Sequence, residues 1–269
     1  MKRKCMSATA RVAMILMSMV GPGAMACRAD QPTAGALAGF DSYIHQAEGR
    51  LGREHASPAG GFLAGADAAR LRRGELVIEE VTPDPAPSLS GAMLHHWRGT
   101  AFAAGAHAAD FERIMRDYAR YPKYFAPQVM AARVLNHSGD HYGVLMRVRQ
   151  KHILTVVLDL TYDVQFGRID RQRGYSISRS TKVAEIDNAG EKDERALTPA
   201  QDHGFLWRLN TYWSYEERDG GLYLQIESVS LTRSIPTGLG WAVGPFVESV
   251  PKESLEFTLR AVSSALRKQ

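Results

Sequence analysis

The sequence predicts an α+β fold in which a curved antiparallel sheet of about seven strands wraps around a long C-terminal helix, with an N-terminal helical extension. Three observations predict it. Segments with strand character follow one another from residue 94 to residue 235. An amphipathic helical pattern closes the chain after Pro251. A shorter helical pattern at residues 37–55 precedes the strands. An antiparallel sheet with one apolar face needs a cover, which the last helix supplies.

The first 26 residues have the features of an export signal. Residues 2–4 are Lys-Arg-Lys, residues 12–20 are almost entirely apolar, and residues 21–23 are Gly-Pro-Gly. Ala24-Met25-Ala26 then matches the small-x-small cleavage pattern. The apolar stretch is short for a membrane span, which needs about 20 residues. We predict a signal peptide at residues 1–26 and an exported protein in the periplasm or cell envelope. An uncleaved N-terminal anchor is the alternative.

Cysteine usage bears on membrane attachment. The chain holds only Cys5 and Cys27, so after cleavage Cys27 is the first residue and has no partner for an intrachain disulfide. A cysteine directly after Ala-Met-Ala resembles the bacterial lipoprotein signal, in which that cysteine is acylated, although Ala24 stands where the motif usually has leucine. Two outcomes stay open, a lipid anchor on Cys27 or a free terminal cysteine.

The excess positive charge of the chain lies in the predicted signal segment. The whole chain has 33 basic and 29 acidic residues, a net charge of +4. The first 26 residues contain four basic residues and no carboxylate, so the remaining chain has 29 of each sign. Strong non-specific binding of nucleic acid is therefore excluded for the body of the protein.

Residues 27–90 are predicted to form a helical extension that ends in a linker. Apolar residues recur at helical spacing over 37–55, a second short helix is expected at 65–72, and residues 75–81 have strand character. The segment 82–90 contains three prolines in five positions, which is typical of an extended connection. The main domain is predicted to span residues 91–269.

The main domain alternates strands with turn signals. Residues 152–166 give the clearest pattern, because apolar and polar residues alternate along them and indicate one buried face. A helix is predicted over 110–119. The predicted strands are 94–103, 128–136, 141–151, 152–166, 174–186, 203–217 and 221–235.

The C-terminal helix is predicted from Leu255, Leu259, Val262 and Leu266, which fall on one face. The preceding segment 236–250 is rich in glycine and proline and is expected to be a flexible, apolar lead-in. If the sheet curls around the helix without filling the space, a cavity remains between them.

The stretch Asp117-Tyr118-Ala119-Arg120-Tyr121-Pro122-Lys123-Tyr124-Phe125-Ala126-Pro127 is similar to the D-Y-x-x-Y-P-x-F-x-P segment that follows the first helix in many proteins of the START-like (SRPBCC) superfamily. That superfamily includes the polyketide cyclase/dehydrase and coenzyme Q-binding families. The resemblance covers residues of about 91–268. It implies the helix-grip fold and a deep pocket for a hydrophobic ligand.

Residues on shared strand faces supply the candidate binding site. Trp207 and Trp213 are predicted to share one face, and Ile226 and Ser228 another, with core packing as the alternative role of the aromatic residues. An inward Arg179 would need a carboxylate or an anionic ligand, and otherwise would reach solvent at the strand end. The predicted ligand-binding residues are Tyr118, Tyr121, Phe125, Leu158, Tyr162, Ile177, Arg179, Trp207, Trp213, Ile226, Ser228, Trp241 and Phe246.

Neither a metal site nor a cofactor is predicted, and no catalytic residue stands out. His95 and His96 would point to opposite faces of a strand, and His137 and His141 flank a turn. The sequence has no G-x-S-x-G motif. We predict an exported protein that binds a lipid or other hydrophobic small molecule. The alternatives are a cyclase or dehydratase acting in the same pocket, and a non-catalytic envelope adaptor whose pocket is filled by side chains.

Overall fold

A computed structural model describes residues 31–57, 67–83, 86–151, 155–235 and 240–268. The predicted signal peptide and Cys27 lie outside the described residues. For residues 240–248 the structure describes the backbone but not the side chains. In the described part of the chain, no helix is both long and apolar enough to span a membrane.

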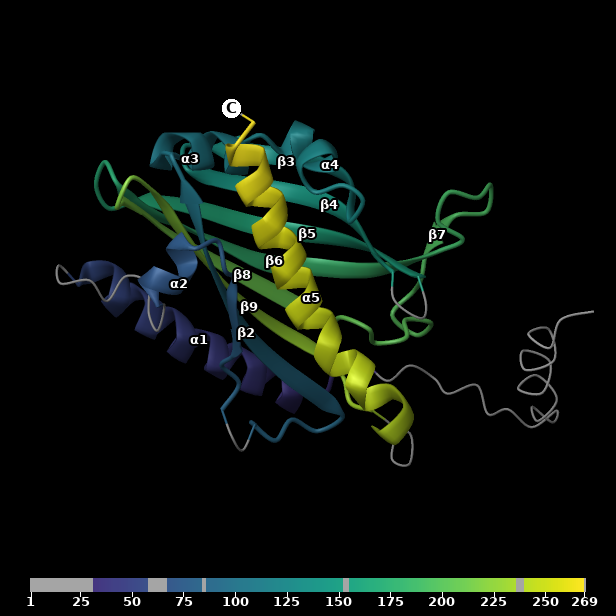
Figure 1. Ribbon diagram of the computed structural model, residues 1–269. Coiled ribbons are helices and arrows are strands. Elements are labelled where there is room, and N and C mark those ends of the chain that lie inside the picture. The colour runs from purple at the N-terminus through teal and green to yellow at the C-terminus, as the bar shows by residue number, and fades with distance from the viewer. Residues whose placement is uncertain (1–30, 58–66, 84–85, 152–154, 236–239, 269) are drawn as a thin grey trace, which may run out of the picture.

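The strands form one antiparallel sheet in the order β1-β2-β9-β8-β6-β5-β4-β3, with the short β7 paired to β6 (Figure 1). This arrangement around a C-terminal helix confirms the predicted helix-grip fold. Seven of the strands are those predicted from residue 91 onward, and β1 and β7 extend the sheet. The strands are β1 (Val77–Glu80), β2 (Ala92–Ala104), β3 (Val129–Ser138), β4 (His141–Lys151), β5 (Thr155–Arg168), β6 (Arg173–Asp187), β7 (Arg195–Ala196), β8 (Arg208–Arg218) and β9 (Gly221–Arg233).

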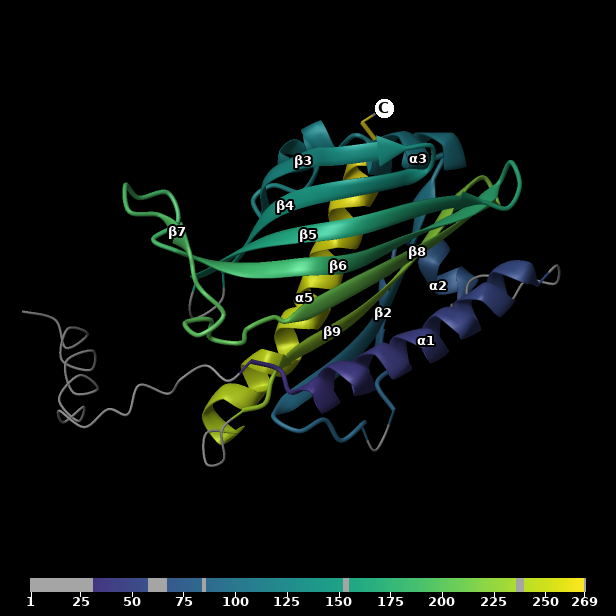
Figure 2. The same cartoon turned by 180° about the vertical axis from the view of Figure 1, so that it is seen from behind.

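Two long helices lie on opposite faces of the sheet, as Figures 1 and 2 show from the two sides. We call the face beneath α5 the inner face and the face beneath α1 the outer face. Among the shorter helices, α2 precedes β1 in the chain, and α3, η2 and α4 lie between β2 and β3. The helices are α1 (Ala34–Ala56), α2 (Ala68–Arg72), α3 (Ala108–Arg116), the 3₁₀ turn η2 (Tyr118–Arg120), α4 (Tyr121–Tyr124) and α5 (Gly240–Leu266).

Two boundaries differ from the prediction. Helix α5 begins at Gly240, so Pro251 lies inside the helix rather than in its first turn. A proline removes one backbone donor but can be accommodated within a helix, and a sequence pattern does not exclude this. Strand β8 begins at Arg208, after the predicted start at residue 203, because the chain up to residue 207 is irregular.

Both faces of the sheet are buried by separate apolar clusters. The inner cluster joins α3, η2 and α4 to the sheet and to Leu255, Leu259 and Val262 of α5. The outer cluster joins Phe40 and Ile44 of α1 to strands β2, β8 and β9. The sheet is therefore the middle of three layers, and any space for a ligand must lie between two of them.

Polar contacts complete the packing of α1 on the outer face. Thr33 caps its first turn by accepting a hydrogen bond from the backbone N–H of Ala36. Further along, Glu48 pairs with Arg179 of β6 at 2.7 Å. Near its end, the His55 ring stacks on Tyr175 of β6, with ring centroids 4.5 Å apart. Helix α1 thus contacts the outer face of the sheet from Phe40 to His55.

Candidate functional site

Packing on the inner face is dense at one end. We call this the α3 end, because α3 covers it. There Phe111, Ile114, Leu222 and Leu224 are fully buried. Seven of the predicted ligand-binding residues are also buried in this cluster: Tyr118, Tyr121, Phe125, Leu158, Tyr162, Trp213 and Ile226. Most of these side chains contact one another, so at this end they form the core of the domain.

The buried tyrosines at this end are neutral phenols. Burial raises the pKa of Tyr118, Tyr121 and Tyr162 above the ordinary tyrosine value. The Tyr121 hydroxyl donates to the carbonyl of Met115 at 2.7 Å. A neutral phenol that is fixed in this way supports the packing of α3 and α4 and gives no acid–base chemistry at neutral pH.

The centre of the inner face is different, because it is polar and reached by solvent. Ser178 of β6 lies opposite Thr211 of β8, Thr211 lies opposite Ser228 of β9, and Ser228 lies opposite Trp97 of β2. We call these four residues the hydroxyl row, because three of them carry hydroxyl groups. All four are only half-buried, although they lie on interior strands beneath α5. The neighbouring row toward the α3 end, with Trp213 and Ile226, is buried.

Trp97 brings an unsatisfied polar group to the hydroxyl row. Its indole Nε1 is buried and has no hydrogen-bond partner among the residues that the structure describes. A buried N–H donor without a partner costs about 1–3 kcal/mol relative to a paired one. The position therefore suits an acceptor group of a bound molecule.

Beyond the hydroxyl row, the inner face holds the buried polar residues Ser230 and His95 and, nearer β4 and β5, several half-buried apolar residues. We call this the open end; it includes the start of β5 and the end of β6. Several apolar residues there are half-buried, on four strands and on α5, although Leu158 and Leu160 of β5, which lie between them, are buried. The half-buried residues are Met146, Val148, Val156, Val183, Leu209 and Phe257. Helix α5 packs against β1, β2 and β9 rather than against these central strands.

Three of the predicted binding residues lie on the outer face, so their placement on the inner face is wrong. Trp207 packs in the cluster beneath α1, since it precedes β8 and does not follow the alternation of that strand. Ile177 packs against the same cluster. Arg179 donates two hydrogen bonds to Glu48 of α1, at 2.7 and 2.9 Å. The sequence indicated that Arg179 needs a carboxylate, and α1 supplies it from the opposite side.

Three further predictions are not tested by the described structure. Trp241 and Phe246 lie in the helical backbone of α5, but their side chains are outside the described part. Cys27 lies before the first described residue. Their roles stay predictions.

The outer face holds a buried charge network that the sequence pattern did not reveal. Glu227 of β9 is almost completely buried and accepts hydrogen bonds from His96 at 2.7 Å and from Arg98 at 2.9 Å. Arg50 of α1 also pairs with it. Burial raises the pKa of Glu227, but the hydrogen bonds from His96 and Arg50 and the charge of Arg98 outweigh burial and lower it to about 2. This network joins α1 to the sheet.

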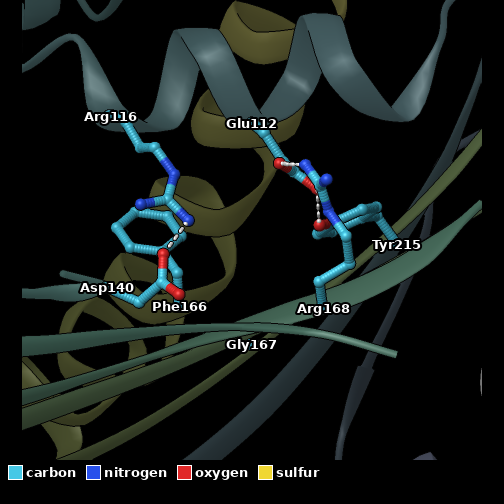
Figure 3. A pocket seen from close by; sticks show the side chains of 7 residues that line it. All are labelled: Glu112, Arg116, Asp140, Phe166, Gly167, Arg168 and Tyr215. Carbon is cyan, nitrogen blue, oxygen red and sulfur yellow. Dashed lines mark hydrogen bonds and ion pairs between the residues drawn. The ribbon is translucent and has the colours of Figure 1, made fainter. Parts of the chain in front are cut away.

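A cavity of about 360 Å³ lies at the α3 end and is lined mainly by charged groups (Figure 3). Glu112 of α3 pairs with Arg168 and accepts a hydrogen bond from the Tyr215 hydroxyl at 2.5 Å. Arg116 pairs with Asp140 at 2.7 Å and lies over the Phe166 ring, 4.2 Å from its centroid. Each cation in this cavity already has a carboxylate partner, so the arrangement is that of a structural ion-pair cluster.

A second cavity, of about 340 Å³, lies at the open end. Met130, Val156 and Phe205 contribute apolar surface to it, and Arg149 and Glu185 contribute charge. Val156 belongs to the inner face, so this cavity adjoins the half-buried apolar surface beneath α5. We call it the open-end cavity.

An acid–base cluster borders the open-end cavity. Glu185 is buried and accepts hydrogen bonds from the backbone N–H and the ring Nδ1 of His203, at 3.1 and 2.7 Å. Burial and the charge of Glu185 together raise the pKa of the nearby Asp202 to about 6, against the opposing hydrogen bond from the Gly204 backbone N–H. His203 is largely exposed.

In the described part of the chain, no group of three or more ligating side chains could hold a metal ion.

The chain is similar in structure to solved proteins, but the comparisons with family models and with curated proteins found no match. A STAR-related lipid transfer protein from Xanthomonas axonopodis is 18% identical over 68% of this chain and 97% of its own, with a TM-score of 0.43. An aromatase/cyclase, Zhui, from a Streptomyces species is 14% identical over 65% of this chain and 95% of its own, with a TM-score of 0.45.

A START superfamily protein from Mycobacterium smegmatis is 12% identical over 66% of this chain and 97% of its own, with a TM-score of 0.40. Shared folds host many unrelated functions. The function is therefore argued from the side chains of this protein.

Proposed function

We propose that this protein is an exported carrier or sensor that binds a lipid or other hydrophobic small molecule on the inner face, between α5 and strands β4, β5, β6 and β8. One observation carries the proposal. The hydroxyl row and the apolar residues beyond it are reached by solvent in the middle of the sheet, beneath a covering helix. An interior that is fully filled by side chains would bury them.

The chemistry of this surface fits an amphiphilic ligand. Half-buried apolar side chains such as Met146, Val183 and Leu209 offer surface for a hydrocarbon part, at roughly 25 cal/mol for each Å² removed from water. Ser178, Thr211 and Ser228 offer hydroxyl groups, and Trp97 offers an unpaired N–H donor, for one polar group. The ligand that fits best has a long apolar body with a single hydrogen-bond acceptor.

Filling the hydroxyl row tests the proposal. Ser178→Leu combined with Ser228→Leu places apolar bulk where the ligand would lie. We expect the affinity for a fluorescent fatty acid or phospholipid probe to fall by about tenfold or more, because the ligand loses both space and polar contacts. Fluorescence titration of the full chain measures the affinity, and thermal unfolding measures whether the variant stays folded.

The matched control is Thr181→Leu, which adds similar bulk at an exposed position of the same strand β6. It should leave probe binding within about twofold of the parent. Absence of probe binding by the parent would refute the proposal, and so would unchanged binding by the filled variant.

Acid–base catalysis at the open end is a second candidate function, favoured by one observation. Glu185 orients His203 through Nδ1 and leaves Nε2 of this largely exposed ring directed away from the carboxylate. If the protein converts its ligand there, His203→Gln should abolish turnover of the bound molecule while leaving its affinity within about threefold. Mass spectrometry of the ligand before and after incubation detects such a conversion.

A further inference from the structure

We infer that the rim of the open-end cavity faces a phospholipid bilayer, so that the ligand site opens toward the membrane. The rim is defined by Met130, Leu197 and Phe205. This inference rests on the proposed function, because it names the surface from which the hydrophobic ligand would enter. Two features of the molecule, the start of its described chain and its exposed apolar side chains, point to the same end.

The described chain begins beside the rim. Gln31 donates a hydrogen bond from its side chain to the backbone carbonyl of Pro199, two residues after Leu197. Cys27 precedes Gln31 by four residues, and four extended residues span at most about 14 Å. An attachment at Cys27 would therefore hold Gln31, and the open end beside it, within a short reach of the attachment point.

The rim also exposes apolar side chains that the fold does not use. Phe205 is 45% exposed and Met130 is 40% exposed, and both line the open-end cavity. Val134 and Leu135 are similarly exposed, but they lie further along β3 and line neither described cavity. Large apolar groups beside a tether are typical of a surface that enters the interface of a bilayer.

The charges at the rim are compatible with a lipid surface. Arg149, which lines the cavity, and Lys151, two residues further along β4, are exposed cations that suit anionic headgroups. Of the acidic residues that line the cavity, Asp187 pairs with Arg195 at 2.9 Å, and Glu185 is buried and accepts a hydrogen bond from His203 at 2.7 Å. Insertion of Phe205 and Met130 would add an apolar contribution to membrane binding.

Photo-crosslinking tests this orientation on the native chain. The full chain is produced in a bacterial host, purified in the form that the host makes, and mixed with vesicles of phosphatidylethanolamine and phosphatidylglycerol containing a diazirine phospholipid. We expect crosslinked peptides to contain residues 197–205 and Met130. Crosslinks at Val134 and Leu135 alone, or no crosslinks, would overturn the inference.

Two variants sharpen the test. Met130→Ser with Phe205→Ser should weaken vesicle association by about tenfold, whereas the control pair Val134→Ser with Leu135→Ser should change it less than about twofold. Equal effects of the two pairs would overturn the inference. We also expect the crosslinks in the filled variant Ser178→Leu, Ser228→Leu. Because this variant should not hold lipid beneath α5, crosslinks in it must come from the bilayer.

The two proposals fail in different assays. Probe binding in vesicle-free solution reports the ligand site, and crosslinking in the filled variant reports the orientation. Probe binding together with an uncrosslinked rim would overturn the membrane-facing orientation and leave the proposed function standing.

Discussion

Trp97 and Trp207 make a natural comparison, because each has a buried indole Nε1 with no hydrogen-bond partner among the described residues. Trp97 lies on the inner face and Trp207 on the outer face. If the ligand accepts a hydrogen bond from Trp97, Trp97→Phe should weaken probe binding by about 3- to 10-fold. Trp207→Phe should leave it unchanged. Fluorescence titration distinguishes them, and equal affinities for the two variants would show that the Trp97 N–H does not contact the ligand.

Glu227 should be among the residues on which stability depends most. Glu227→Gln removes the charge that His96, Arg98 and Arg50 surround, and breaking a buried ion pair costs about 3–5 kcal/mol. Glu79→Gln is the control, since Glu79 contacts the same Arg98 but its side chain is 41% exposed, and the expected cost is below about 1 kcal/mol. Urea unfolding measures both; similar losses for the two variants would contradict the account of this network.

Sequence patterns predicted which residues share a strand face, but they did not always identify the inner face, because Ile177 and Arg179 in the middle of β6 lie on the outer face. Trp213 and Ile226 lie on the inner face as alternation requires. Trp207 does not, because it precedes β8. The role of Glu227 could not be predicted, because a charged residue on the second face of a strand normally indicates solvent, and only the packing of α1 shows that this face is buried.

At the scale of elements, α1 should loosen from the sheet in mild acid. Burial, assisted by the positive charge of Arg50, lowers the pKa of His55 to about 4, below its ordinary value of 6.5, whereas the charge of Glu227 acts in the opposite direction. Undocked α1 binds the proton more readily, so docking loses stability as the pH falls from about 6.5 to about 4, by on the order of 1 kcal/mol. Hydrogen exchange of the α1 amides should accelerate in that window beyond the intrinsic pH effect.

The control for this prediction is His55→Gln, which keeps a side chain able to hydrogen-bond with Ser214 but cannot titrate. Its α1 protection should not depend on pH between 4 and 6.5. If the parent shows the same flat profile, His55 does not govern the docking of α1.

The elements themselves follow from the sequence with few exceptions. Period-two alternation located β5, and helical spacing located α1 and the second half of α5. The first half of α5 was predicted as a flexible lead-in, because glycine and proline disfavour helix. That α1 covers the outer face was not predictable, because an amphipathic helix does not identify the surface on which it packs.

At the scale of the whole molecule, cleavage of the predicted signal peptide would set the net charge of the mature protein. Removal of residues 1–26 leaves 29 basic and 29 acidic residues, whereas the full chain has a pI near 9.1. The protein isolated from its own host should therefore focus near neutral pH, with Cys27 as its first residue. A focusing point that stays near 9 would contradict cleavage.

Binding of a hydrophobic molecule on the inner face is the central claim, and native mass spectrometry of protein isolated from its own host tests it most directly. The account predicts a bound apolar molecule that dissociates on denaturation and is lost in the Ser178→Leu, Ser228→Leu variant. A protein that carries no such molecule, and takes up no lipid probe when one is offered, would contradict it.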